Sequence, residues 1–191
     1  MQSANVAPPD IELLQAARRH VPEAWDSLLK QHQLPLYAYV VGLLADESAA
    51  LDVVQETFAA AVRNIASLRD DGRFAAWLFG IAHQKCIQHW RRVRRDQTVF
   101  APESEETAID WPGPDEVDPR GILLQREQAG EFFALVDRLP SVQRSALLLH
   151  VLEDFSLEEI AGITAVPVGT VKSRLHHAKR ALRHLVETNL R

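Results

Sequence analysis

The amino-acid sequence predicts an all-α protein of two small helical domains, and three observations lead to this fold class. Apolar residues recur at helical spacing, and no stretch alternates in the manner of a half-buried strand. An acidic segment that contains prolines, 98–120, interrupts the helical pattern. Near its end the chain has two helical patterns joined by a tight turn, a helix-turn-helix. We therefore expect helical domains at 10–97 and 121–191, with 98–120 as a flexible linker that lets them fold and unfold independently.

Charge distribution and cysteine content indicate where the acidic residues are concentrated and in which compartment the protein is expected. The chain has 191 residues and a formal net charge of −5. Residues 98–120 hold seven acidic side chains and one basic one, so the acidity belongs to the linker and both domains keep basic clusters. Cys86 is the only cysteine, which excludes an intrachain disulfide and suits a reducing compartment. With no signal pattern and no long apolar run, we expect a cytoplasmic protein without membrane insertion.

Short helices are predicted at the start of the first domain. Asp10 can cap the first, Pro22 can begin the second, and 36–44 reads as a third that ends near Asp46. Asp46 can cap a longer helix, whose apolar stripe is Leu51, Val54, Phe58, Val62 and Ile65. A different face carries Asp52, Gln55, Glu56 and Arg63. This face is either a solvated surface or a docking surface for another protein.

The next predicted helix, 73–95, has an apolar start and a basic end. Its inner stripe is Phe74, Trp77, Leu78, Ile81 and Ala82, and its last turns carry Arg91, Arg92, Arg94 and Arg95. The helix dipole favours cations there, and arginines beside Trp90 also suit single-stranded nucleic acid. His83, Cys86 and His89 are spaced by three, but such steps drift around a helix and no fourth ligand is near. We predict no metal site, and a packed Cys86 between two surface histidines; a redox role for this cysteine stays open.

The second domain is predicted to begin with a helix over about 122–138. Ser141 can cap the next helix, and a capping box at 156–159 (SLEE) begins the helix-turn-helix. After a break at 162–166, Pro167 restarts a helix whose apolar stripe is Val168, Val171, Leu175, Ala178, Leu182 and Leu185. Its free face has no acid between Lys172 and Arg183. This pattern fits a helix that enters the DNA major groove, and equally a plain helical hairpin with a solvated basic face.

Five separated stretches resemble the extracytoplasmic-function (ECF) group of bacterial sigma factors. In chain order they are 52–58 (DVVQETF), 73–82 (RFAAWLFGIA), 139–144 (LPSVQR), 158–161 (EEIA) and 166–175 (VPVGTVKSRL). The likeness runs from about residue 10 to 187. A sigma factor of this type has two domains and a linker, as this chain does.

The resemblance implies a role for each surface. Core RNA polymerase, through its β′ coiled-coil and its β subunit, is the expected partner of Asp52, Gln55 and Glu56. The melted −10 element is assigned to Arg63, Arg73, Trp77, Gln84, Gln88, Arg91, Arg92, Arg94 and Arg95. The −35 duplex is assigned to Thr170, Lys172, Ser173, Arg174, His177, Lys179 and Arg180. The resemblance further implies a linker that threads toward the polymerase active site, control by an anti-sigma factor, and no catalytic residue, cofactor or metal.

Several positions depart from the family's usual pattern. Gln84 and Gln88 stand where asparagine and aspartate are common, and His177 replaces a frequent arginine, so the −10 and −35 preferences are open. Thr164 and Ala165 stand where a leucine and a turn glycine are usual, and a left-handed Ala165 costs roughly 1 kcal/mol.

Two other function classes explain less of the chain. A DNA-binding regulator with this helix-turn-helix accounts for 121–191 but leaves the 52–58 signature unexplained. An enzyme lacks support, since no phosphate loop, triad or convergent metal set is present. We therefore expect a transcription initiation factor without catalysis of its own.

Overall fold

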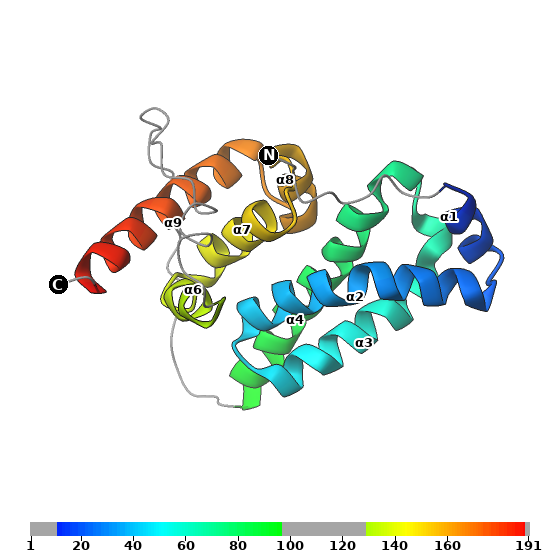
Figure 1. The fold of residues 1–191 in the computed structure, drawn as a ribbon, viewed down its shortest axis with the longest axis horizontal. Coiled ribbons are helices and arrows are strands. Elements are labelled where there is room, and N and C mark those ends of the chain that lie inside the picture. Colours follow the sequence, from blue (N-terminus) through cyan, green and yellow to red (C-terminus); the bar gives the residue numbers. More distant parts are fainter. Residues whose placement is uncertain (1–10, 97–128, 190–191) are drawn as a thin grey trace.

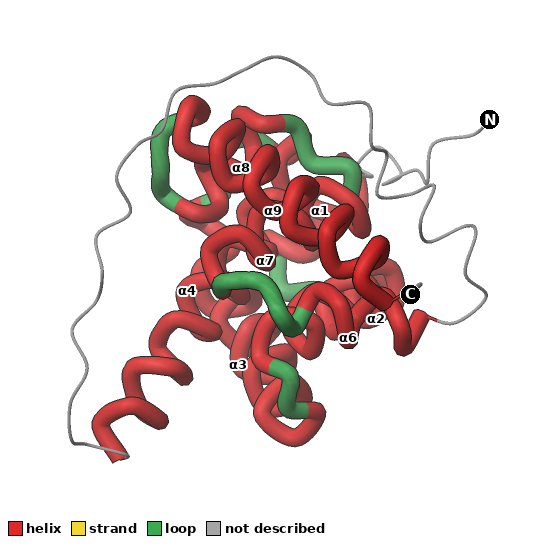
Figure 2. Tube along the Cα trace, turned by 90° about the vertical axis from the view of Figure 1, so that its left-hand side faces the viewer, coloured by secondary structure: helices red, strands yellow, loops and turns green. Residues whose placement is uncertain are grey.

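The computed structural model describes residues 11–96 and 129–189, and every regular element in these ranges is helical (Figure 2). The predicted all-α fold class is confirmed. The N-terminal half consists of α1 (Ile11–Arg18), α2 (Pro22–Leu44), α3 (Glu47–Asn64), the short 3-10 turns η1 (Ile65–Ser67) and η2 (Asp71–Arg73), and α4 (Phe74–Asp96). The C-terminal half consists of α6 (Ala129–Val136), α7 (Ser141–Leu152), α8 (Leu157–Thr164) and α9 (Val168–Asn189). Asp10 and the predicted linker 98–120 lie outside the described residues.

Helix α2 is longer than the sequence predicts, because it continues through Pro35 (Figure 1). A proline inside a helix removes one backbone hydrogen bond and normally bends or ends the helix. Here Trp25 and Leu28 before the proline, and Tyr39 and Leu43 after it, are all buried in the core. Packing on both sides therefore keeps one helix where two were expected.

Two of the three predicted caps in the described range are present. Asp46 accepts from the amide of Ala49 at 3.0 Å. Ser156 Oγ accepts from the amide of Glu159 at 3.2 Å, and the Glu159 carboxylate accepts from the amide of Ser156 at 2.9 Å. The predicted cap at Ser141 is wrong: Pro140 occupies the N-cap position of α7, without a side-chain bond.

The buried faces of α3 and α4 are rotated from the predicted stripes. Leu51 is 53% exposed, and α3 buries Ala50, Val53, Thr57 and Ala61 along with Phe58. Helix α3 packs against both α2 and α4, so small residues serve where three helices meet. Alanine and threonine do not read as a core stripe in a sequence. On α4, Phe79 and His83 are buried, whereas Trp77 and Ile81 are only half-buried.

The two halves pack together around one hydrophobic core. That each half folds and unfolds independently stays a prediction. Helix α8 packs against α4, and α7 packs against α2 (Figure 1). At this interface the rings of Phe79 and Phe155 meet edge to face, with centroids 5.2 Å apart. Gly42 allows Phe133 to approach α2 closely, because a Cβ added there would lie 2.7 Å from the Phe133 ring.

Arg144, from the 139–144 motif, ties the turn between α6 and α7 to the end of α2. Its guanidinium donates to the Asp137 carboxylate at 3.1 Å, to the Leu139 carbonyl at 3.2 Å and to the Asp137 carbonyl. It also donates to the Leu43 carbonyl on α2 at 3.4 Å. The planar fork of an arginine suits such a multiple contact.

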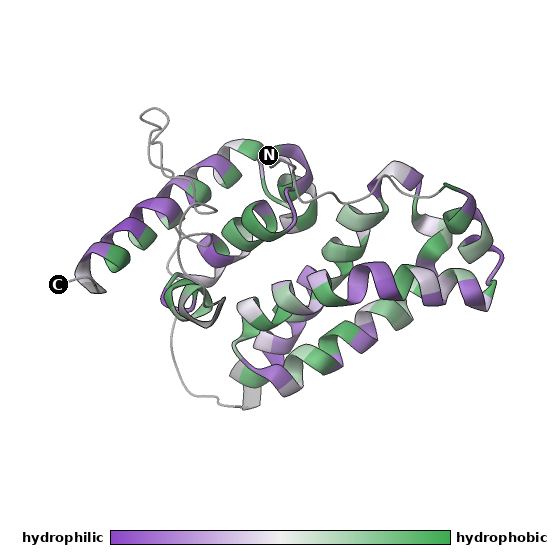
Figure 3. Ribbon diagram, viewed as in Figure 1, coloured by the Kyte–Doolittle hydropathy of each residue, from purple (hydrophilic) through white to green (hydrophobic). Residues whose placement is uncertain are grey.

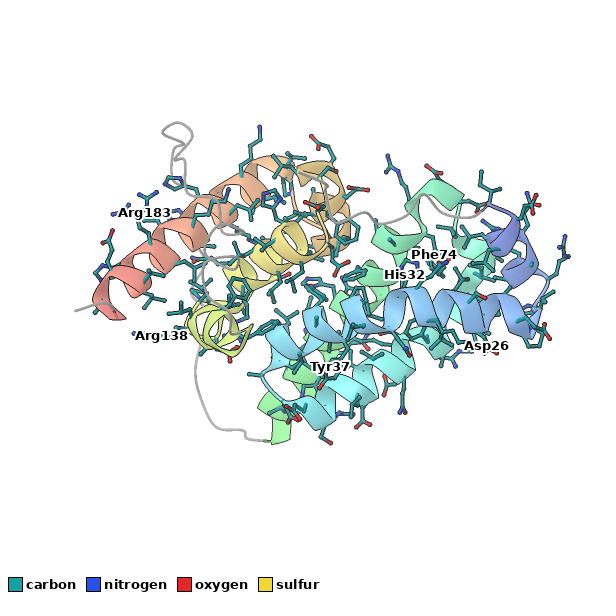
Figure 4. All side chains as sticks on the ribbon, in the orientation of Figure 1. Asp26, His32, Tyr37, Phe74, Arg138 and Arg183 are labelled. Carbon is teal, nitrogen blue, oxygen red and sulfur yellow. The ribbon has the colours of Figure 1, made fainter. Side chains whose placement is uncertain are left out.

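Two rings from different helices pack against each other near the start of α4. His32 of α2 lies against Phe74, with ring centroids 5.3 Å apart (Figure 4). Burial lowers the pKa of His32 below its usual range. No helix in the described ranges is both long and apolar enough to cross a membrane.

Candidate functional site

The polar face of α3 is open to solvent. We call Asp52, Gln55 and Glu56 the docking face; their spacing of three and one places them on one side of the helix, and all three are exposed. Lys85 Nζ donates to the Glu56 carboxylate at 2.8 Å. This hydrogen bond, with the charges of Lys85 and Arg92, lowers the pKa of Glu56 and keeps it ionised. Leu51, beside this face, was assigned to the core from its sequence spacing, and its exposure adds an apolar side chain to the surface.

A second polar face, on α4, lines a cavity of about 800 Å³. Four predicted −10 residues, Arg73, Trp77, Gln84 and Gln88, lie on this cavity. Trp77 is half-buried, its ring tilted on Phe74 with centroids 5.9 Å apart. A flat aromatic ring with amide and guanidinium groups around it can stack a base and hold a phosphate.

The cavity is also lined by residues that were not predicted from the sequence. Arg69 and Asp70 contribute from the turn between α3 and α4, and Lys85 from α4. Lys85 could have been found, because it shares a helical face with Ile81 and Gln88. Arg69 carried no such signal, since no periodicity places a turn residue against a helix.

The opposite wall of the cavity comes from α8 in the other half of the chain. Glu158, Glu159, Gly162 and Ile163 line it. Two acids of the helix-turn-helix therefore stand across from the basic side chains of the N-terminal half. An anionic strand in this space would lie beside those carboxylates.

The remaining predicted −10 residues lie elsewhere. Arg63 is exposed on α3 and does not line the cavity, and Arg91 and Arg92 are exposed farther along α4. The side chains of Arg94 and Arg95 lie outside what the structure describes. The structure thus brings four of the predicted residues together and extends a basic edge beyond them.

Helix α9 is hydrophilic on one side and hydrophobic on the other (Figure 3). Val171, Leu175, Ala178 and Leu182 are buried, as predicted. Among the predicted −35 residues, Lys172 and Arg180 are exposed, whereas Thr170, Ser173, Arg174, His177 and Lys179 are half-buried. The Ser173 hydroxyl donates to the Thr170 carbonyl at 3.0 Å, so it is engaged with its own helix.

The side chains of two α9 residues do not point outward, as contact with a DNA duplex would require. His177 lines a shallow depression with Pro140 and Gln143 at the start of α7, so it is less outward than its spacing indicates. Arg174 lies near His83 of α4, and its buried Nε has no hydrogen-bond partner among the described residues. Part of the predicted reading surface therefore faces the N-terminal half.

A buried polar cluster joins the halves beside Arg174. The Tyr39 hydroxyl lies 2.8 Å from His83 Nδ1 and 3.2 Å from Ser145 Oγ, which connects α2, α4 and α7. Burial, then the charge of Arg174, lowers the pKa of His83 to about 4. Burial also raises the pKa of Tyr39. The predicted surface position of His83 is wrong, because Tyr39 of α2 and Ser145 of α7 lie against its ring and the side chain is buried.

Cys86 is buried as predicted, and burial raises the pKa of its thiol to about 12. At neutral pH it is a thiol rather than the reactive thiolate. Within the described ranges, no group of three His, Cys, Asp or Glu side chains is placed to hold a metal ion.

Comparison with known proteins identifies relatives along most of the chain. The family model for sigma-70 region 2 matches residues 28–96, and that for sigma-70 region 4 matches residues 130–182. The RNA polymerase sigma-H factor of Pseudomonas aeruginosa is 32% identical over 185 residues, which cover 95% of this chain and 96% of that protein. The ECF RNA polymerase sigma-E factor of Escherichia coli K12 is 30% identical over the same length, with the same shares covered.

Two solved structures share the fold. CnrH, in complex with the cytosolic domain of CnrY, matches with a TM-score of 0.67 at 22% identity over 94% of this chain and 98% of that one. The sigma factor RpoE of Bartonella quintana, in complex with the anti-sigma factor NepR, matches with a TM-score of 0.63 at 24% identity. That match covers 84% of this chain and 97% of RpoE.

Proposed function

The chain belongs to the sigma-70 family of RNA polymerase sigma factors, in its extracytoplasmic-function group, and we propose that it uses separate helices to bind polymerase and to recognise promoter DNA. In this role it is an alternative initiation factor that directs core polymerase to specific promoters and assists their melting. It acts where the polymerase is, in the cytoplasm, and has no catalytic residue or cofactor of its own.

The docking face on α3 is the proposed contact with core polymerase. Asp52, Gln55 and Glu56 are exposed, and Lys85 fixes the Glu56 carboxylate. The β′ coiled-coil is the partner that we assign to this face, with further contacts to the β subunit. An ionised, positioned carboxylate beside an exposed Leu51 offers both polar and apolar contact area.

Promoter DNA is assigned to the other two surfaces. The cavity around Trp77, with Arg73, Gln84 and Gln88, takes bases of the melted −10 element, and the arginines farther along α4 hold its backbone. On α9, Lys172 near the N-terminal end reaches base edges of the −35 duplex. Thr170, Ser173 and His177 flank it, while Arg174, Lys179 and Arg180 serve the phosphates.

We also propose control by an anti-sigma factor. Of the two solved structures described above, one holds the sigma factor RpoE with the anti-sigma factor NepR, and the other holds CnrH with the cytosolic domain of CnrY. A partner that covers the docking face would block polymerase without unfolding either half.

The single observation that carries the proposal is the exposed docking face on a helix whose other sides are buried. The test is gel filtration of the chain with core polymerase in the absence of DNA. The wild-type chain should co-elute, and an Asp52→Lys/Glu56→Lys variant should not. Exposed substitutions move stability by about 0.5 kcal/mol or less each. Because Glu56→Lys also places a like charge beside Lys85, whose side chain is only 17% exposed, thermal unfolding of the variant accompanies the test.

A matched control has the same change in net charge elsewhere. Glu23→Lys/Asp26→Lys reverses two exposed acids in the first turns of α2, of which Asp26 is labelled in Figure 4, and should co-elute like the wild type. Co-elution of the Asp52/Glu56 variant at wild-type affinity would remove the docking assignment.

A further inference from the structure

Arg18, the last residue of α1, reaches across to the turn between α3 and α4. Its Nη1 donates to the Ile65 carbonyl at 3.1 Å. Its Nη2 donates to the Leu68 carbonyl at 2.7 Å and to the Asp71 carboxylate at 2.6 Å. The three acceptors are far from Arg18 in sequence but close to one another in one turn.

Arg18 is itself held in place by the core. On α1, Leu14 and Ala17 are fully buried. The Trp25 indole donates to the Ala17 carbonyl at 3.1 Å, which locks the end of α1 onto α2. The Arg18 and Asp71 side chains are only 29% and 25% exposed, so their ion pair is partly shielded from water. A rigid donor on a rigid helix can fix the acceptors that it binds.

The turn that Arg18 holds forms one edge of the α4 cavity. Leu68, Arg69, Asp70 and Arg73 of the segment 65–73 line that cavity together with Trp77. Local bonds shape the turn itself, since Asp70 accepts from the Gly72 amide at 2.9 Å. Ile65 and Leu68 anchor the turn in the core, and Arg18 adds a polar link from α1 to three of its groups.

We propose that Arg18 is a positioning residue for −10 recognition: by fixing the turn 65–73 it sets where Arg69 and Arg73 stand relative to Trp77. This inference rests on the proposed function of the cavity. Arg18 acts through the turn rather than by touching DNA. It lies outside the stretch 28–96 that matches sigma-70 region 2, and its role follows from its contacts alone.

The test uses full-length chain with core polymerase in run-off transcription, across promoters that differ only in the −10 element. Arg18→Ala should lower the preference for the best −10 sequence by about tenfold, because misplacement by about 1 Å is costly at a recognition site. The −10 preference of Arg18→Lys should lie between those of the wild type and Arg18→Ala, since one ammonium cannot reach all three acceptors. Affinity for core polymerase and for a −35 duplex should stay at wild-type values.

The matched control is Arg19→Ala, which removes the same charge from an exposed neighbour and should leave the −10 preference unchanged. If the Arg18→Ala chain does not fold, Asp71→Asn tests the same link, because it removes the charge and keeps the shape. Asp71→Asn should reduce the −10 preference in the same direction by a smaller factor.

Three results separate the possibilities. A wild-type −10 preference in both Arg18→Ala and Asp71→Asn would overturn the inference. So would a salt slope of single-strand binding that falls by about one unit in Arg18→Ala, because that is the sign of a direct phosphate contact. If the wild-type holoenzyme itself has no −10 preference, the proposed function of the cavity fails, and the inference fails with it.

Discussion

The polar faces of α3 and α4 differ in what stands in front of them. The docking face has open solvent before Asp52, Gln55 and Glu56. The α4 face keeps Gln84 and Gln88 in solvent, but the space before Trp77 is bounded by Glu158 and Glu159 of α8. The docking face is thus open to solvent, whereas the space in front of Trp77 is bounded by another helix.

This difference indicates an order of events. Under the proposed function, core polymerase could reach the docking face while the halves are packed together, because this face is exposed. Under the proposed function, a promoter strand in the α4 cavity would lie beside the carboxylates of α8, and Arg174 of α9 lies near His83. We therefore expect the interface between the halves to open before full promoter contact, and its stability to control that step.

The largest expected effect is a loss of folding stability at acid pH, caused by protonation of His83 at this interface. Its pKa is about 4 in the packed chain and about 6.5 when exposed, so the unpacked state binds more protons between these values. The stabilisation is complete above pH 6.5 and is lost as pH falls toward 4, on the order of 3 kcal/mol in total. Denaturant unfolding between pH 4.5 and 7.5 measures this slope, and His83→Asn should flatten it.

A second buried group acts in the opposite direction and must be controlled. Burial raises the pKa of Glu153 to about 7, so the contribution of Glu153 to stability is complete below about pH 4.5 and is lost as pH rises through 7. The His83→Asn comparison is best made in a Glu153→Gln background, which removes this opposing slope. An unchanged acid slope in that background would exclude His83 from the interface energetics.

Gly42 offers a way to open the interface without changing charge. In Gly42→Ala the new methyl meets the Phe133 ring and Leu148, and such overpacking costs about 1–3 kcal/mol. Single-stranded −10 DNA should then bind the free chain several-fold more tightly, while core polymerase affinity stays the same. Gly169→Ala on α9, where a Cβ meets nothing within 4 Å and which does not line the cavity, is the control. Equal DNA affinity in both variants would mean that α8 does not limit access.

The sequence predicted the helices and most of their ends because those signals are local. The capping box at Ser156 and the cap at Asp46 are set by residues three apart. The buried stripe of α9 was also predictable, since one helix face packs on one neighbour. The prediction failed for α3, where two neighbours bury alanines, and Leu51 is exposed.

Contacts between the halves could not be predicted from local patterns. His83 and Ser145 are 62 residues apart, and no periodicity relates them. For the same reason the docking face was found as a set of residues on one helix, whereas Arg69, Glu158 and Glu159 joined the cavity only through tertiary packing. The acidic, proline-containing linker favoured separate domains, but it carries no signal about whether the folded halves pack.

Two exposed residues of α9, Lys172 and Arg180, are expected to differ in how they contribute to DNA binding. Lys172 is exposed near the start of the helix, and a lysine–guanine contact is worth about 1–3 kcal/mol of base discrimination. Lys172→Ala should flatten preference at one or two −35 positions. Arg180→Ala should instead weaken all duplexes alike and reduce the salt slope by about one unit. Duplex titrations at several salt concentrations distinguish these outcomes, and identical behaviour of the two variants would contradict the assignment.

The smallest effect concerns two alanines in left-handed backbone, one in each half. Ala45 ends α2 with φ 55° and ψ 28°, and Ala165 ends α8 with φ 55° and ψ 42°. This conformation costs an L-residue about 1–2 kcal/mol and glycine almost nothing. Because glycine also adds freedom to the unfolded chain, each substitution to glycine should stabilise by about 0.5–1 kcal/mol. Ala161→Gly, inside α8, should destabilise by about 1 kcal/mol.

Thermal unfolding of these variants also tests whether the halves behave as one unit. If the shared core makes unfolding cooperative, Ala45→Gly and Ala165→Gly each raise the midpoint of the same single transition, and their effects add because the sites share no partner. If the halves unfold separately, each substitution moves only the transition of its own half. Two transitions that respond independently would mean that the packing between α4 and α8 is too weak to delay promoter contact.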